Sequence, residues 1–525
     1  MIHRLLSLIA CSLICNFVVA QSFDSTAYKY GQTITAENLE EHLTIIASDE
    51  FQGRMTGSEG QEKAAKYISN LYQELGLEKS GKKEKSYYQM VPLEESSWDN
   101  PTITARDKEY TFLNDFYCFP NSSQVLSDVA NDIVFLGYGI SDKAYDDYKN
   151  TDVRGKVILI RAGEPKKKNG TYHVTGTKEQ SEWTTNWRKK LEYAKLKGVK
   201  ALFVIDEDIK KSSARFKPFI TQAGMKLRDG GAGRYANTFY ISQEMANELL
   251  KTNKIEKWYK KINKKGKSKA QTVSQKIKFD IKKKENVFES PNVMGFLEGT
   301  DLKDEIVVIT SHYDHVGTSG DKIFNGADDD GSGTVSVMEI AEAFSEAKKN
   351  GDGPRRSILF MNVTGEEKGL LGSEFYVNNP VYPLENTIVD LNIDMVGRTD
   401  DLHDEETRDY VYVIGSDRLS TELHKINEVA NETYIKMNLD YKYNDKNDKN
   451  RFYYRSDHYN FAKNNIPIIF YFNGTHEDYH QATDTVDKIE FDMLEKRAKL
   501  VFYTAWMLAN QDKRIEVDVV EDDEE

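Results

Sequence analysis

The stretch "RSILFMNVTGEEKGLLGS", residues 356–373, joins an apolar run to two adjacent glutamates and then to glycines. The apolar run has the composition of a buried strand, and Glu366 and Glu367 follow just beyond its end. Two neighbouring carboxylates repel each other. The pair is therefore either a solvated acidic turn or part of a site in which a positive charge lies beside it. The segments before and after it distinguish these two interpretations.

The order of buried strand, loop and helix repeats through residues 286–512. This alternation is typical of α/β proteins, in which helices cover both faces of a largely parallel sheet. The expected elements are strands at 304–312, 356–364, 386–397, 409–416 and 466–474 and helices at 333–349 and 491–509.

The preceding part of the chain predicts two further regions. Residues 36–77 contain two helical patterns, the second of which begins at Ser58, three residues before Gln61, as in a capping box. Residues 126–285 change in character to short strands and helices, and we expect them to form a separate insert. The lysine-rich run 251–284 predicts an exposed helix and strand, with contact to an anionic polymer as the lesser alternative.

Length and charge restrict the class of protein. A chain of 525 residues predicts two or three domains. A net charge of −14 disfavours nucleic acid as a partner, because phosphate binding needs a basic surface. A mean hydropathy of −0.64 argues against a membrane protein. The acidic end of the chain, residues 513–525, is expected to be a disordered tail.

The first 20 residues predict a signal peptide, and hence a secreted or periplasmic protein. Arg4 precedes an apolar run, and "VVA" at 18–20 fits a cleavage site before Gln21. A lipid anchor at Cys11, in "LIAC", is the lesser alternative. After cleavage only Cys118 remains, so the mature chain cannot form an internal disulfide.

Acidic residues and histidines follow nearly every expected strand of the main α/β region. Function in such sheets gathers at the carboxyl ends of the strands. Carboxylates crowded there would be unfavourable without cations, and a mixture of histidine and carboxylate suits zinc, with manganese or cobalt as weaker candidates. The residues concerned are His312, Asp314, Asp328, Asp329, Asp330, Glu366, Glu367, Asp394 and His480.

The segment "HEDYH", residues 476–480, also matches the H-E-x-x-H zinc motif. That motif requires a helix, whereas this segment follows a strand and continues into "QATDT" without helical periodicity. We therefore expect His480 to be a ligand and His476 not to be one.

Five ordered motifs, "HYDHVG", "NGADDDGSG", "TGEEKGLLGS", "NIDMVGR" and "YHQATDT", resemble those of the secreted co-catalytic dizinc aminopeptidases. This family also includes glutamate carboxypeptidases and glutaminyl cyclases. The segment from "YDDYKNTDVRGKVILIRAG" to "AKLKGVKALFVI" is similar to the protease-associated domain often inserted in them. The resemblance covers nearly all of residues 36–510.

The resemblance implies a phosphorylase/hydrolase-like three-layer α/β/α sandwich with a mostly parallel mixed sheet. Its peptidase domain would comprise residues 21–125 and 286–512, and residues 126–285 would be a smaller, β-rich α/β protease-associated insert.

The resemblance also implies two zinc ions per chain. His312 and Asp394 would hold one zinc, Glu367 and His480 the other, and Asp329 would bridge them.

Three further roles are carried over from the family. Asp314 would orient His312, Glu366 would be the general base, and Tyr479 would donate to the oxyanion unless it only packs. Asp328 and Asp330 are expected to serve as turn or cap residues, and Asp484 to cap a helix or fix the His480 loop. His315 and His458 match no ligand position.

The implied activity is removal of N-terminal residues from peptides with a free N-terminus. A carboxypeptidase of the same superfamily is the nearest alternative; it would need arginines facing the substrate carboxylate, and Arg398, Arg451 and Arg455 are available. Glutaminyl cyclase fits a large insert poorly. A non-catalytic receptor-like or scaffold homologue is the alternative from another class, and it would be expected to lack metal. The sequence does not determine the oligomeric state.

Overall fold

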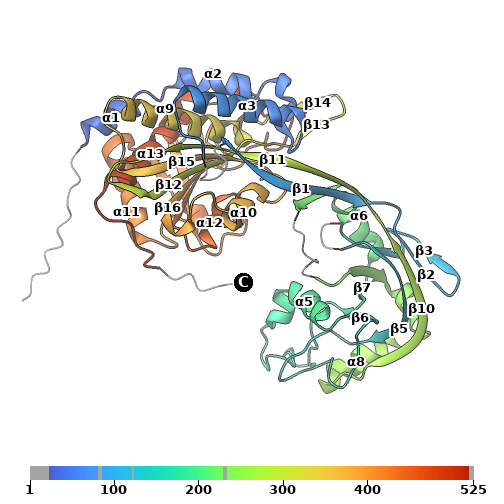
Figure 1. Ribbon diagram of the computed structural model, residues 1–525. Coiled ribbons are helices and arrows are strands. Elements are labelled where there is room, and N and C mark those ends of the chain that lie inside the picture. The colour runs from blue at the N-terminus through green and yellow to red at the C-terminus, as the bar shows by residue number, and fades with distance from the viewer. Residues whose placement is uncertain (1–22, 81–85, 121–122, 229–232, 234, 520–525) are drawn as a thin grey trace, which may run out of the picture.

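The computed structural model describes residues 23–80, 86–120, 123–228, 233 and 235–519 (Figure 1). The predicted signal peptide lies outside the described residues. The chain forms two lobes, each built on its own sheet. Two long antiparallel strands, β1 (Tyr88–Trp98) and β11 (Lys283–Leu297), extend from the first lobe toward the second (Figure 1).

The first lobe contains a nine-stranded mixed sheet. Its four central strands are parallel to one another, whereas β17, β11, β1 and β8 pair antiparallel to their inner neighbours. The expectation of a mostly parallel sheet is thus correct only for the centre, because the flanking strands connect through hairpins and returns rather than helical crossovers. In spatial order the strands are β18 (Asn438–Asp440), β17 (Tyr410–Ile414), β19 (Ile468–Phe472), β16 (Thr387–Ile393), β12 (Leu302–His312), β15 (Arg356–Val363), β11, β1 and β8 (Gly224–Leu227).

Helices cover both faces of this sheet (Figure 1). Along β12, Val307 and Ile309 face one apolar core and Ile306 and Val308 face another, which explains why the strand reads as a continuous apolar run. One face is covered by α1 (Ser25–Gly31), α2 (Ala36–Ile46), α3 (Glu59–Glu74), α9 (Gly333–Lys349), α11 (Thr421–Ala430) and α13 (Phe491–Asn510), and the other by α10 (Leu371–Asn378) and α12 (His458–Ala462).

The second lobe has an eight-stranded mixed sheet. In spatial order its strands are β3 (Lys108–Tyr110), β2 (Thr102–Ala105), β10 (Gln271–Ile281), β5 (Leu126–Phe135), β6 (Val157–Arg161), β7 (Ala201–Asp206), β9 (Thr238–Ser242) and β4 (Phe116–Tyr117). Its helices are α4 (Glu182–Thr185), α5 (Arg188–Leu196), α6 (Ile209–Thr221), α7 (Gln243–Leu249) and α8 (Ile255–Lys265). The lysine-rich run is indeed a helix and a strand, α8 and β10.

The predicted boundary of the insert at residue 126 is too late. Strands β2, β3 and β4 belong to the second sheet, so this lobe begins near residue 102. These strands have two to four residues, too few for a period-two pattern to identify. Conversely, β8 lies within the predicted insert but pairs with β1 of the first sheet.

The short elements connect these layers. They are η1 (Asp49–Arg54), β13 (Gly317–Ser319), β14 (Lys322–Phe324), η2 (Ala327–Ser332), η3 (Leu384–Asn386), η4 (Asn431–Ile435), η5 (Lys442–Asn444), η6 (Phe452–Tyr454) and η7 (Val486–Lys488). Helix α3 starts as predicted, since the Ser58 hydroxyl accepts a hydrogen bond from the Gln61 N–H at 3.2 Å. Among the described residues no helix has the length and apolarity needed to cross a bilayer.

The predicted disordered tail begins too early. Ile515 is buried, and the Asp518 carboxylate accepts hydrogen bonds from the backbone and hydroxyl of Thr421. An apolar residue at 515 and a capping acid at 518 hold the chain against α11, although the composition is acidic. Residues 520–525 of the tail lie outside the described residues.

Candidate metal centre

The four central strands end at one edge of the first sheet, and the predicted metal-site residues lie at or near this edge. His312 is the last residue of β12, and Asp394 directly follows β16. Glu366 and Glu367 follow β15, and His480 lies in the loop after β19. Asp329 comes from η2, the turn between β14 and α9. Parallel strands therefore bring together six residues that are up to 168 positions apart in the sequence.

The first group of side chains consists of His312, Asp329 and Asp394. The Nε2 atom of His312 lies 3.4 Å from Asp329 Oδ1 and 3.6 Å from Asp394 Oδ1. All three residues are buried, and their ligand atoms lie within 4.8 Å of one another. One histidine nitrogen and two carboxylate oxygens thus converge on a single point.

The second group uses the other oxygen of Asp329. The Nε2 atom of His480 lies 3.0 Å from Asp329 Oδ2 and 3.2 Å from Glu367 Oε1. Asp329 therefore presents Oδ1 to one group and Oδ2 to the other, which is the geometry of a bridging carboxylate.

The structure adds His315 to this second group. Its Nδ1 atom lies 3.0 Å from Glu367 Oε1 and 3.7 Å from Asp329 Oδ2, and the residue is fully buried. From the sequence, His315 matches no ligand position of the family that the chain resembles. The available signal was its spacing of three residues after His312, at the end of the same strand.

Several atoms of the two groups are buried without a hydrogen-bond partner. These atoms are both ring nitrogens of His315, Oδ2 of Asp329 and Oε1 of Glu367. They lack well-directed hydrogen bonds although they lie close to one another or to His480. Buried polar atoms normally have partners. Atoms that crowd together without forming well-directed hydrogen bonds are suited to share a cation, and the nitrogen and carboxylate donor set fits zinc.

The electrostatics indicate the same need for positive charge. Burial alone would lower the pKa of His480, but the nearby carboxylates of Asp329 and Glu367 raise it to about 10. Burial, together with the charges of Glu367 and Asp394, raises the pKa of Glu366 well above its usual value. Both shifts arise because carboxylates outnumber cations in the site, and a divalent ion would relieve this excess of negative charge.

Asp314 supports the site differently from the prediction. The group nearest His312 Nδ1 is the main-chain carbonyl of Asp314, at 3.0 Å, whereas its carboxylate is 3.9 Å away. The carboxylate instead accepts hydrogen bonds from the Thr56 hydroxyl at 2.7 Å and from the Glu366 N–H at 3.2 Å. Beyond the end of β12 the main-chain carbonyl of Asp314, rather than its side chain, lies against the imidazole. Asp314 therefore orients His312 through its backbone and Glu366 through its carboxylate.

The acids flanking Asp329 hold its turn in place, as predicted. Asp330 accepts hydrogen bonds from the N–H groups of His312, Gly333 and Met395, which ties η2 to two strand ends. Asp328 accepts one from the Gly397 N–H at 2.7 Å.

Asp484 anchors the same turn from the loop that carries His480. Its carboxylate accepts hydrogen bonds from the N–H groups of Asp328 and Asp329 at 3.1 Å. The prediction that Asp484 fixes the His480 loop agrees with these contacts.

A fully buried arginine, Arg54, lies behind the site and was not identified from the sequence. Its guanidinium donates to four main-chain carbonyls, those of Tyr313, Ile46, Asn325 and Gly326. Tyr313 directly follows His312, and Asn325 and Gly326 directly precede η2, so three of the four carbonyls belong to segments that carry metal-site residues. The stretch "GRMTGSEG" predicts only a loop, and a pattern in one segment cannot reveal an arginine that bonds to distant carbonyls.

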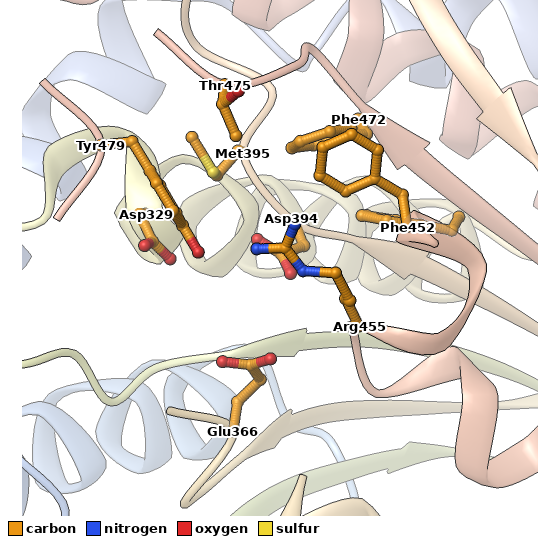
Figure 2. A pocket seen from close by; sticks show the side chains of 10 residues that line it. Asp329, Glu366, Asp394, Met395, Phe452, Arg455, Phe472, Thr475 and Tyr479 are labelled. Carbon is orange, nitrogen blue, oxygen red and sulfur yellow. The ribbon is translucent and has the colours of Figure 1, made fainter. Parts of the chain in front are cut away.

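Glu366 projects into a pocket beside the two groups (Figure 2). Figure 2 shows it on one side of the pocket and Asp329 and Asp394 on the other. Its carboxylate comes within 3.8 Å of His312 Nε2 and accepts no hydrogen bond from the described residues. The Tyr479 ring stacks on His480 with centroids 4.0 Å apart, and its hydroxyl points into the pocket.

His476 and His458 have structural contacts. His476 lies in a loop, not a helix, and its Nε2 atom pairs with Asp328 Oδ2 at 3.0 Å, as expected for the misleading H-E-x-x-H match. His458 is buried, stacks on Phe470 and bonds through Nε2 to the Tyr453 carbonyl.

Two curated relatives each match less than half of this chain. A probable leucine aminopeptidase of Arthroderma otae is 28% identical over 232 residues, 43% of this chain and 59% of that protein. A probable zinc metalloprotease of Pyricularia oryzae is 27% identical over 282 residues, 46% of this chain and 52% of that protein. The chain thus spans somewhat more than half the length of these curated relatives.

The solved structure of an aminopeptidase from Aneurinibacillus sp. strain AM-1 shares the fold. It superposes with a TM-score of 0.51 at 18% identity and covers 94% of this chain and 98% of its own. Residues 292–505 match the sequence model of Peptidase family M28. This segment contains every strand end that contributes to the candidate metal centre, so the similarity to Peptidase family M28 covers the whole of the candidate site.

Proposed function

We propose that this protein is an exported zinc-dependent aminopeptidase that hydrolyses the peptide bond next to a free N-terminus. The observation that carries the proposal is the division of Asp329 between two groups of ligand atoms, with Oδ1 3.4 Å from His312 Nε2 and Oδ2 3.0 Å from His480 Nε2. A bridging carboxylate is the signature of a two-metal site. The zinc metalloprotease and aminopeptidase relatives support the choice of metal and reaction.

The donor set fits two zinc ions. His312 and Asp394 would hold one ion, Glu367 and His480 the other, and Asp329 both. When bound, two such ions lower the pKa of a shared water and polarise the scissile carbonyl. His315 lies close enough to Glu367 to hold that carboxylate in place.

Glu366 is the general base in this proposal. It lies in the pocket and accepts no hydrogen bond from the described residues, so its carboxylate is available to a water. It takes a proton from the attacking water and delivers it to the leaving amine. The hydrogen bond from its N–H to Asp314 holds the segment in position.

Tyr479 is the proposed donor to the oxyanion that develops on the scissile carbonyl. Its hydroxyl points into the pocket, and the surrounding acids raise its pKa in addition to burial, so it stays protonated at neutral pH. A protonated phenol can donate a hydrogen bond to a developing negative charge.

A carboxypeptidase is the second candidate, and one observation favours it. Arg455 lines the pocket and could face a substrate carboxylate, whereas Arg398 pairs with Asp478 and Arg451 lies over Tyr454. The five ordered sequence motifs, which resemble those of the dizinc aminopeptidases, still favour an aminopeptidase.

The test is hydrolysis of one short peptide, free and N-acetylated, by the zinc-loaded mature protein, with mass spectrometry of the products. The proposal predicts loss of residues from the free N-terminus and protection by acetylation. Trimming from the C-terminus of both forms would instead establish a carboxypeptidase. A metal-free purified protein with no product from either form would indicate a scaffold.

Export and the nature of the second lobe are also part of the proposal. Residues 1–20 have the pattern of a signal peptide, and the second lobe has the sequence resemblance to a protease-associated domain. The intact mass of the exported protein should correspond to a chain that begins at Gln21. A lipidated chain that begins at Cys11 would contradict this.

A further inference from the structure

We propose that Arg455 binds the side-chain carboxylate of an acidic N-terminal residue, so that the enzyme prefers substrates that begin with glutamate or aspartate. The inference rests on the proposed aminopeptidase function and adds the substrate class. It concerns one wall of the pocket beside the metal centre (Figure 2).

Most of this wall is apolar. Phe452, Phe470, Phe472 and Met395 line the pocket together with Arg455. Without the arginine, such a wall would select a large apolar side chain. The guanidinium gives the wall a fixed positive charge, because arginine stays protonated at any physiological pH.

The guanidinium of Arg455 is available to a ligand. Its central carbon lies 4.9 Å from the centroid of the Phe452 ring, and within the described chain it has no carboxylate within ion-pair distance. Arg455 is also exposed. Stacking on an aromatic ring fixes the plane of a guanidinium while leaving its N–H groups free to form a bidentate pair.

Neighbouring arginines do not offer the same opportunity. Arg398 donates to Asp478 Oδ2 through both Nη1 and Nη2, at 3.2 Å each. Arg451 stacks over Tyr454 at 4.6 Å and does not line this pocket. Of the arginines near the centre, Arg455 alone combines a free guanidinium with a place in the wall, as far as the described residues extend.

The distribution of charge in the pocket matches an acidic N-terminal residue. Asp329, Glu366 and Asp394 place negative charge in the pocket, where a free amino group would be attracted, and Arg455 is the one cationic side chain among the described residues that line it. An N-terminal glutamate carries both charges, and its two methylene groups can contact the phenylalanines. A basic side chain would be repelled by Arg455.

The experiment compares the zinc-loaded wild type with Arg455→Met on four aminoacyl anilides, those of glutamate, glutamine, leucine and lysine. Glutamine has the shape of glutamate without the charge. We expect the wild-type kcat/KM to be highest for glutamate and lowest for lysine. In Arg455→Met the glutamate-to-glutamine ratio should fall roughly 10- to 100-fold, the value of a charge-assisted hydrogen bond. The control Arg451→Met changes a stacked, exposed arginine outside the pocket and should keep the wild-type ratio.

Binding of free glutamate and glutamine, measured by calorimetry, tests the inference independently of turnover. We expect the wild type to bind glutamate at least tenfold more tightly than glutamine, and Arg455→Met to lose this difference. If no anilide is cleaved but the binding difference and its loss are observed, the proposed function fails and the role of Arg455 stands.

Two outcomes would overturn the inference while leaving the aminopeptidase intact. One is a wild type that cleaves the leucine anilide well and the glutamate anilide no better than the glutamine anilide. The other is an Arg455→Met defect that appears only on peptides with a free C-terminal carboxylate, which would assign the guanidinium to that group instead.

Discussion

The two adjacent glutamates that follow β15 should fail in different ways when each is replaced by glutamine. Glu366→Gln removes a carboxylate that accepts no hydrogen bond from the described residues and lies 3.8 Å from His312 Nε2. The change is isosteric and breaks no contact needed for folding. We expect stability to stay within about 0.5 kcal/mol and both zinc ions to be retained. The value of kcat should fall about 10²- to 10⁴-fold, as for loss of a general base.

Glu367→Gln should instead affect the metal. Oε1 of Glu367 lies 3.0 Å from His315 and 3.2 Å from His480, so the loss of its charge weakens the second group of ligand atoms directly. We expect this variant to lose about one of two equivalents of zinc, since a neutral amide is a poor ligand for this ion. Activity should then recover partly at high zinc concentration, which Glu366→Gln should not show.

The assay is anilide or peptide hydrolysis together with metal content by mass spectrometry and thermal unfolding. Glu374→Gln, in the following helix α10, is the matched control for the chemical change and should behave as the wild type. Retention of more than a tenth of wild-type kcat by Glu366→Gln would refute its role as base. Loss of zinc from that variant, with full zinc in Glu367→Gln, would show that the two roles are reversed.

Three further predictions concern stability. Arg54→Met should lower the free energy of unfolding by about 3–5 kcal/mol, because four buried carbonyls lose a charged donor. The measurement is urea unfolding of this variant, with Arg54→Lys measured for comparison. An unchanged midpoint for Arg54→Met would contradict the prediction. Burial lowers the pKa of His458 from 6.5 to about 3, so below pH 6.5 the unfolded chain binds a proton that the folded chain cannot. The free energy of unfolding should therefore decrease as the pH is lowered, by about 2 kcal/mol from pH 6.5 to 5 through this group. In urea unfolding, the stability of His458→Asn should depend correspondingly less on pH. Chelation of zinc should lower the melting temperature, and zinc at about 100 times its dissociation constant should restore about 2.7 kcal/mol, whereas a melting temperature insensitive to both would indicate that no metal is held.

Several features of the fold followed from the sequence because they depend on local patterns. The strands that carry the site are buried on both faces, so each reads as a continuous apolar run, and α9 and α13 keep a helical periodicity. The boundary at residue 126 failed because strands of two to four residues have no measurable period. The prediction of parallel strands was wrong at the flanks of the sheet, because the direction of a strand is set by its connections and not by its composition.

For the site, the sequence by itself determined which residue types stand at the strand ends, since a strand followed by an acid or histidine is visible along the chain. The tertiary structure decided how they are combined. In the structure, Asp329 contacts His312 through one carboxylate oxygen and His480 through the other. His315 lies beside Glu367, and the carbonyl of Asp314, rather than its carboxylate, lies nearest His312. The structure also singled out Arg455 from three available arginines. These are contacts between segments far apart in sequence, and only the packing of the sheet and its loops fixes such distances.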